Sequence, residues 1–108
     1  MDKRTNYQKI IADILTEVHE QLICDTTREN LLSIDHQHGQ YLLISDGWEA
    51  SKRFYVPIIH IEIRHDNSVW LRQENTDLEI GEELIRRGIS RTDIVPAFYS
   101  PQMRQLVH

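Results

Sequence analysis

The sequence predicts an α+β fold in which helices flank an antiparallel sheet. Apolar residues recur at helical spacing near the N-terminus, between Tyr7 and Leu22. Through the middle of the chain they instead alternate with polar residues at a spacing of two, and turn-forming residues separate the alternating runs. This order indicates an N-terminal helix, then a meander of about four to five strands, then shorter helical segments.

The first element is an amphipathic helix from about Arg4 to Ile23. Its apolar stripe follows the spacing that places side chains on one helical face, and comprises Tyr7, Ile11, Ile14, Val18 and Leu22. The polar run Asp25-Thr26-Thr27 ends it. Cys24, the only cysteine in the chain, follows this apolar face, which favours a buried reduced thiol over a nucleophile.

Two hairpins are predicted next. Strands over 32–35 and 41–45 join across a polar loop containing Gly39, and Gly47-Trp48 should break the second strand before a turn over 49–52. The longest strand runs over 53–64, where Pro57 indicates a bulge or an edge position because proline cannot donate to a neighbouring strand. A turn at Asp66-Asn67 returns the chain through a strand over 69–73.

The C-terminal third contains a second helix. Asn75, Thr76 or Asp77 should cap its start and Gly88 its end. Residues 90–93 are predicted to form a capping box, extended structure should resume over 94–95 and 97–98, and Ser100-Pro101 should begin a short helical turn to Leu106. No internal repeat or linker is evident, so residues 1–108 are predicted to form a single domain.

The chain is acidic, with a net charge of −5. An acidic sequence without a basic run is a poor candidate for autonomous DNA binding, because lysine and arginine supply most of the affinity for phosphates. The local cationic groups expected from sequence are Arg86-Arg87 with Arg91 and Lys52-Arg53. No apolar run of membrane-spanning length and no signal segment is evident, so a cytoplasmic protein with no membrane partner is expected.

Two groups of residues contain side chains that could bind a metal ion. Asp35, His36 and His38 lie close in sequence, but a hairpin loop spreads such side chains into water. Asp46 and Glu62 with a histidine would suit a small metal-dependent nuclease, the alternative function. In that arrangement Arg64 occupies the place of the lysine that assists the attacking water, and arginine is too persistently protonated to act as a base.

The predicted longest strand carries three polar side chains on one face. His60, Glu62 and Arg64 alternate with isoleucines at positions 59, 61 and 63. A His60–Glu62 acid–base pair specifies no nucleophile, so a structural or interfacial role is favoured for His60. No catalytic, cofactor-binding or metal-binding residue is therefore predicted. The candidate partner surface is this strand face together with Phe98 and Tyr99.

A series of landmarks from Tyr41 to Arg104 resembles the XisI family, the cyanobacterial fdxN element excision controlling factors. The landmarks are Tyr41-Leu42-Leu43, Gly47-Trp48, Arg53, Tyr55, Ile59-His60-Ile61-Glu62-Ile63, Val69-Trp70-Leu71-Arg72-Gln73, Thr76, Ile80, Glu83-Leu84, Gly88-Ile89, Asp93-Ile94-Val95, Ser100-Pro101 and Arg104. They span roughly two thirds of the chain in consistent order. The opening amphipathic helix fits the same family.

This resemblance implies a non-enzymatic regulatory factor. Its role would be the control of a site-specific DNA excision during heterocyst development, with an XisH-like protein or a site-specific recombinase, or both, as partners. An acidic surface suits a basic DNA-handling partner. The early strands of the predicted meander lack protective charges at their edges, which also suggests a homo-oligomer.

Overall fold

A computed structural model describes residues 2–22 and 28–106 of the chain. Its sheet has five strands in sequence order, namely β1 (Arg28–Asp35), β2 (Gln40–Glu49), β3 (Lys52–Ile63), β4 (Val69–Glu74) and β5 (Ile94–Pro96). The first four strands pair antiparallel and confirm the predicted meander. β5 pairs parallel with β4, so the complete sheet is mixed.

The helix α1 (Lys3–Gln21) confirms the predicted N-terminal helix. Asp2 caps it by accepting a hydrogen bond from the backbone N–H of Thr5. The apolar stripe is buried against the sheet, and the buried residues of α1 are Tyr7, Ile10, Ile11, Ile14, Leu15 and Val18. Because the stripe is long and regular, local periodicity was enough to locate this element.

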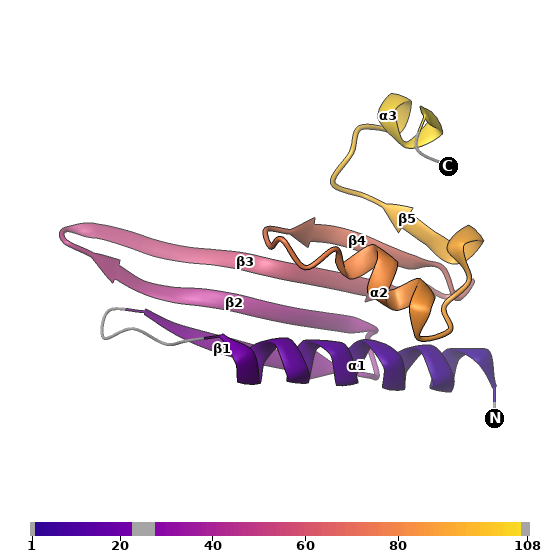
Figure 1. Ribbon diagram of the computed structural model, residues 1–108, viewed down its shortest axis with the longest axis horizontal. Coiled ribbons are helices and arrows are strands. Elements are labelled where there is room, and N and C mark those ends of the chain that lie inside the picture. The colour runs from indigo at the N-terminus through magenta and orange to yellow at the C-terminus, as the bar shows by residue number, and fades with distance from the viewer. Residues whose placement is uncertain (1, 23–27, 107–108) are drawn as a thin grey trace.

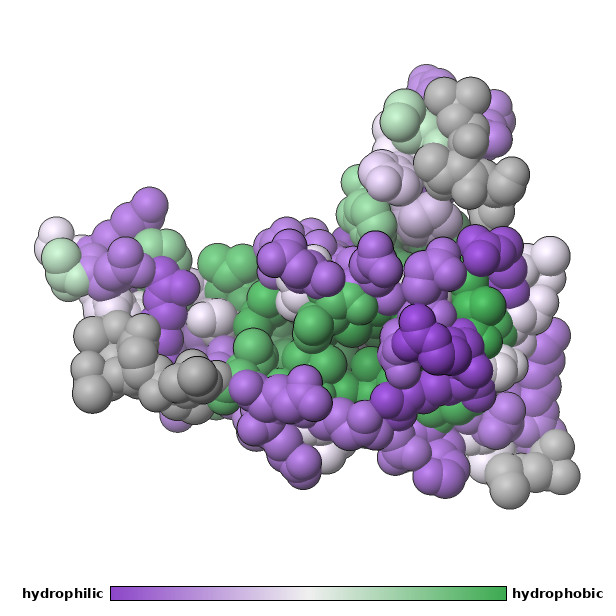
Figure 2. All heavy atoms as spheres, viewed as in Figure 1, coloured by the Kyte–Doolittle hydropathy of each residue, from purple (hydrophilic) through white to green (hydrophobic). Residues whose placement is uncertain are grey.

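One face of the sheet carries the core. Its buried side chains alternate along the central strands, and the fully or almost fully buried residues are Tyr41, Leu43, Ile59, Ile61, Ile63, Val69 and Leu71. The helix α2 (Ile80–Arg86) adds Ile80 and Leu84 to the same core. Figure 1 shows α1 and α2 over this face, and Figure 2 shows apolar side chains gathered between the two helices. The alternate residues of β3 and β4 therefore point to the opposite face.

The β2–β3 hairpin projects beyond α1, α2 and β4 (Figure 1). The predicted break at Gly47-Trp48 is wrong, because β2 continues through both residues in register with β3. The predicted turn over 49–52 is confirmed, because the chain reverses at Ala50 and Ser51, with Ala50 at a positive φ of 56°. Pro57 lies next to a register shift, since Leu43 pairs with Ile59 and the next residue pairs with Pro57. The predicted bulge is thus confirmed.

The start of the second helix was predicted wrongly. The polar residues at 75–77 do not cap it, since α2 begins at Ile80 after Glu79 in the left-handed conformation. The carboxylate of Glu74, at the end of β4, accepts the backbone N–H of Ile80 instead. The last residue of β4, six positions before Ile80, therefore replaces the predicted cap. The predicted C-terminal glycine is confirmed, because Gly88 follows the helix at a φ of 119°.

The closing segment begins with a 3₁₀ helix, η1 (Arg91–Asp93), where the predicted capping box is not formed because Ser90 makes no side-chain capping bond. The extended segment predicted at Ala97-Phe98 is also wrong: Tyr99 N–H donates to Pro96 O in a turn. The predicted last helical turn is confirmed as α3 (Pro101–Leu106). Cys24 lies outside the described residues. Within the described ranges, no helix has the length and apolarity needed to span a membrane.

Candidate interaction surface

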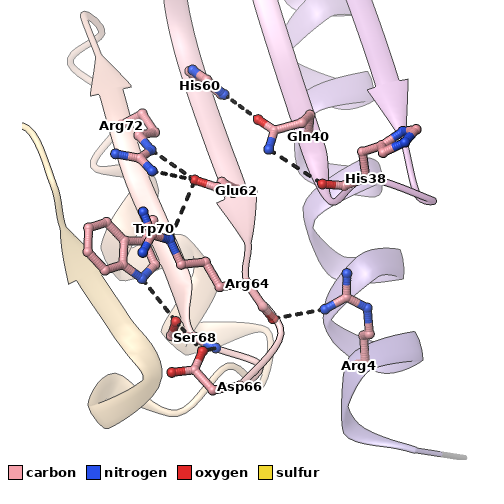
Figure 3. Close-up of polar contacts among 10 residues, drawn as sticks. All are labelled: Arg4, His38, Gln40, His60, Glu62, Arg64, Asp66, Ser68, Trp70 and Arg72. Atoms are coloured by element: carbon pink, nitrogen blue, oxygen red, sulfur yellow. Dashed lines mark hydrogen bonds and ion pairs between the residues drawn. The ribbon is translucent and has the colours of Figure 1, made fainter.

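The three candidate strand residues occupy the open face of the sheet. His60 and Glu62 lie on β3 between buried isoleucines, and Arg64 follows its last residue. The register places Glu62 opposite Trp70 of β4. Figure 3 shows these side chains with Arg72 on one side of the two strands. The sequence-predicted strand face therefore exists, and β4 widens it.

Glu62 is the centre of the charged contacts on this face. Arg72 donates from Nε and Nη2 to Glu62 Oε1, at 2.9 and 2.6 Å, while Arg64 Nε lies 3.7 Å from the same oxygen. Burial alone would raise the pKa of Glu62, but its hydrogen bond and charge interaction with Arg72 outweigh burial and lower it. Glu62 is thus an ionised carboxylate that already accepts hydrogen bonds from Arg72, and its lowered pKa makes it a poor general base.

His60 is held by an amide. Its Nε2 lies 2.8 Å from Gln40 Oε1, so Nε2 carries the proton in this contact. Burial and the nearby charge of Arg72 lower the pKa of His60, which favours the neutral imidazole. Since His60 binds Gln40 and Glu62 binds Arg72, the acid–base pair considered from the sequence is not formed.

Trp70 links the strand face to the closing segment. The guanidinium of Arg64 lies 3.7 Å from its ring centroid, and those of Arg72 and Arg104 lie at 5.1 and 5.4 Å. Arg104 belongs to α3 and also donates from Nε to Tyr99 O. Arg104 thus connects the residues around Tyr99 with Trp70 of β4, which lies opposite Glu62 of β3.

Phe98 and Tyr99 are exposed and contact each other. Their ring centroids are 4.7 Å apart, and 44% and 39% of each residue is exposed. Large aromatic residues with exposed rings beside arginines are the composition found at the centre of protein interfaces. The predicted role of both residues as partner contacts remains a proposal.

Of the three arginines around Trp70, the sequence placed Arg64 on the candidate surface but missed Arg72 and Arg104. Alternation along β4 was the available signal, because buried Val69 and Leu71 oblige Trp70 and Arg72 to share the other face. No local pattern places Arg104 there, since it reaches Trp70 only through the path of β5 and α3.

Asp46 and Glu62, the two carboxylates of the predicted nuclease alternative, do not lie close together. Asp46 pairs with Arg53 and lies in register with Tyr55, whereas Glu62 lies in register with Gln40. Six residues of β2 separate these positions, which corresponds to about 20 Å. His38 binds Asp35 at 2.8 Å, and the part of the chain described here contains no group of three or more metal-ligating side chains. Asp46 and Glu62 therefore cannot share a metal ion in this arrangement.

The projecting hairpin carries a second group of exposed aromatics. Trp48 is 53% and Tyr55 58% exposed, and Arg53 lies 5.6 Å from both ring centroids. These rings lie beyond the end of β4 and far from Trp70, so they provide a natural comparison surface.

Comparisons with known proteins identify the family. The family model described as XisI protein matches residues 1–108. A crystal structure of a XisI-like protein from Anabaena variabilis is similar at 32% identity and a TM-score of 0.90, covering 97% of this chain and 95% of that one. A second crystal structure, described as fdxN element excision controlling factor XisI from Anabaena variabilis, is similar at 32% identity and a TM-score of 0.85. The match covers 98% of this chain and 96% of that one. A search of curated proteins finds no match. The chain belongs to the XisI family.

Proposed function

We propose that this chain is a non-enzymatic regulatory factor that controls a site-specific DNA excision by binding a protein partner. Support for the excision role comes from the description of the similar Anabaena protein as an fdxN element excision controlling factor. Heterocyst development is the setting that the family resemblance implies. An XisH-like protein or a site-specific recombinase, or both, are the proposed partners.

One observation favours action through a partner. The open face of the sheet combines the occupied Glu62–Arg72 pair with Trp70, and the exposed rings of Phe98 and Tyr99 lie in the segment that Arg104 joins to it. Interfaces use aromatic and arginine anchors of this kind. The same groups are poorly arranged for acid–base chemistry, because His60 already binds Gln40 and Glu62 already binds Arg72.

The proposal is tested by capturing partners from a nuclease-treated cyanobacterial lysate at physiological salt. Stoichiometry of the purified complex is then measured by light scattering. The expected result is a stoichiometric complex with an XisH-like protein or a recombinase, which the double variant Phe98→Ala/Tyr99→Ala loses.

A matched control comes from the projecting hairpin. Tyr55→Ala removes a ring that is 58% exposed but lies outside the proposed surface, and it should leave capture unchanged. Failure to retain either class of protein would contradict the proposed function. Equal capture by the double variant would contradict the assignment of Phe98 and Tyr99.

A further inference from the structure

A hollow of about 390 Å³ lies beside Arg64, where β3 ends. Its lining includes Arg4 from α1, His38 from the turn before β2, and Glu62, Arg64 and His65 around the end of β3. Figure 3 shows Arg4 on α1 reaching the backbone carbonyl of Arg64, whose side chain runs toward Trp70, with His38 in the turn before β2. Such a meeting of distant segments forms a concave site at the margin of the candidate interaction surface.

The hollow has an excess of positive charge. Among its described lining residues, Glu62 carries the one carboxylate, and the shorter contacts of that carboxylate are made with Arg72, outside the lining. Arg64 Nε lies 3.7 Å from the same carboxylate, so the two guanidinium groups of the lining, those of Arg4 and Arg64, have one carboxylate between them. This local charge is opposite in sign to the net charge of −5 of the chain.

Both arginines are positioned before any ligand binds. Arg4 Nη1 donates to the backbone carbonyl of Arg64 at 2.9 Å, and the Arg64 guanidinium lies 3.7 Å from the ring centroid of Trp70. Ordering long side chains in advance reduces the entropy lost on binding. A fixed guanidinium presents parallel N–H donors that match the two oxygens of a carboxylate.

We propose that this hollow binds a carboxylate side chain from an acidic segment of the protein partner. The inference rests on the proposed function, because it names the chemistry by which the partner is recognised. Nucleic acid fits the hollow less well. Arg64 already covers a face of Trp70 on which a base could stack.

The test is an NMR titration in a Trp48→Phe background, where Trp70 is the remaining tryptophan. Its indole N–H donates to Ser68 Oγ at 2.9 Å and its ring contacts Arg64, so its resonance reports on the site. The probes are an acetylated, amidated tetraglutamate peptide, the matching tetraglutamine peptide and an oligothymidylate. Saturable shifts are expected with tetraglutamate alone, and they should weaken as salt rises.

Arg4→Gln is the decisive variant, because it removes one guanidinium from the hollow without touching the ring of Trp70. Affinity for tetraglutamate should fall about tenfold, as expected for the loss of a charge-assisted hydrogen bond. Arg91→Gln is the matched control, since Arg91 is 65% exposed and lies near Glu82 outside the hollow. This control should bind tetraglutamate normally.

Three results would overturn the inference. They are no saturable binding of tetraglutamate, unchanged binding by Arg4→Gln, and Arg4-dependent binding of oligothymidylate in preference to the peptide. The peptide titration needs no partner, so a failed capture experiment leaves its result standing. Conversely, a captured partner that binds Arg4→Gln normally would reject the carboxylate site while leaving the proposed function intact.

Discussion

Replacing Gly39 with alanine should destabilise the turn between β1 and β2. Gly39 has a φ of 67°, and a Cβ atom added there would lie 2.4 Å from the backbone oxygen of Ile63. The left-handed conformation costs a non-glycine residue about 1–2 kcal/mol. Relief of the clash would pull the turn from β3 and weaken the 2.9 Å hydrogen bond from Ile63 N–H to Gly39 O, a further loss of about 1 kcal/mol.

Gly81→Ala provides the matched control. A Cβ atom at Gly81 would make an ordinary 3.4 Å contact with Leu71 Cδ1. Both substitutions restrict the unfolded chain to a similar extent, a stabilising effect of about 0.4–1 kcal/mol that cancels in the comparison. The free energies of unfolding of the two variants should therefore differ by about 2–3 kcal/mol, with Gly39→Ala the less stable.

Urea unfolding followed by circular dichroism measures this difference, provided that the two variants show equal dependence on urea concentration. Thermal unfolding should show Gly39→Ala melting about 10 °C below Gly81→Ala, given the size of the chain. Unfolding free energies equal to within about 0.5 kcal/mol would refute the close approach of Gly39 to β3.

Two further predictions concern the core and its margin. Leu84→Ala should lower the free energy of unfolding by about 2.5–4 kcal/mol, because Leu84 is fully buried. Leu78→Ala is the control, since Leu78 is 48% exposed, and it should lower that free energy by less than about 1 kcal/mol. Similar losses for the two variants in urea unfolding would contradict the burial of Leu84. Asp93→Asn should destabilise the chain at pH 7, because hydrogen bonds from Lys3 and from Tyr7 lower the pKa of Asp93 below 3.8. A lowered pKa stabilises the fold above the ordinary value and loses that effect as pH falls through the folded-state value. The deficit of Asp93→Asn in urea unfolding should therefore shrink between pH 5 and pH 2, and a constant deficit would contradict this role.

Much of the fold could be predicted because its signals are local. The stripe from Tyr7 to Val18 identifies α1 without knowledge of any partner, and strict alternation identifies the core strands. Gly88 likewise marks a helix end through its own backbone conformation. The prediction is wrong where pairing or contacts with other elements determine the ends of a strand or helix. Gly47 predicts a break in the strand, but β2 continues past it because its pairing with β3 is uninterrupted there.

The start of α2 and the parallel strand β5 depend on tertiary contacts. Glu74, six residues before Ile80, supplies the cap that three nearer polar residues were expected to supply. The candidate surface likewise has a part that local sequence signals predict and a part that depends on tertiary contacts. Alternation correctly grouped His60 with Glu62, while the contact of Arg104 with Trp70 requires the path of the whole closing segment.

The central claim is that the partner binds the open face of the sheet and the closing segment. Hydrogen–deuterium exchange of the free chain and of its complex with the captured partner tests this most directly. Exchange should slow in the turn 64–68 and over 97–105 and stay unchanged at the hairpin tip, 48–53. Protection at the hairpin tip, with the turn and closing segment unchanged, would contradict the claim and assign the partner to the aromatic residues Trp48 and Tyr55.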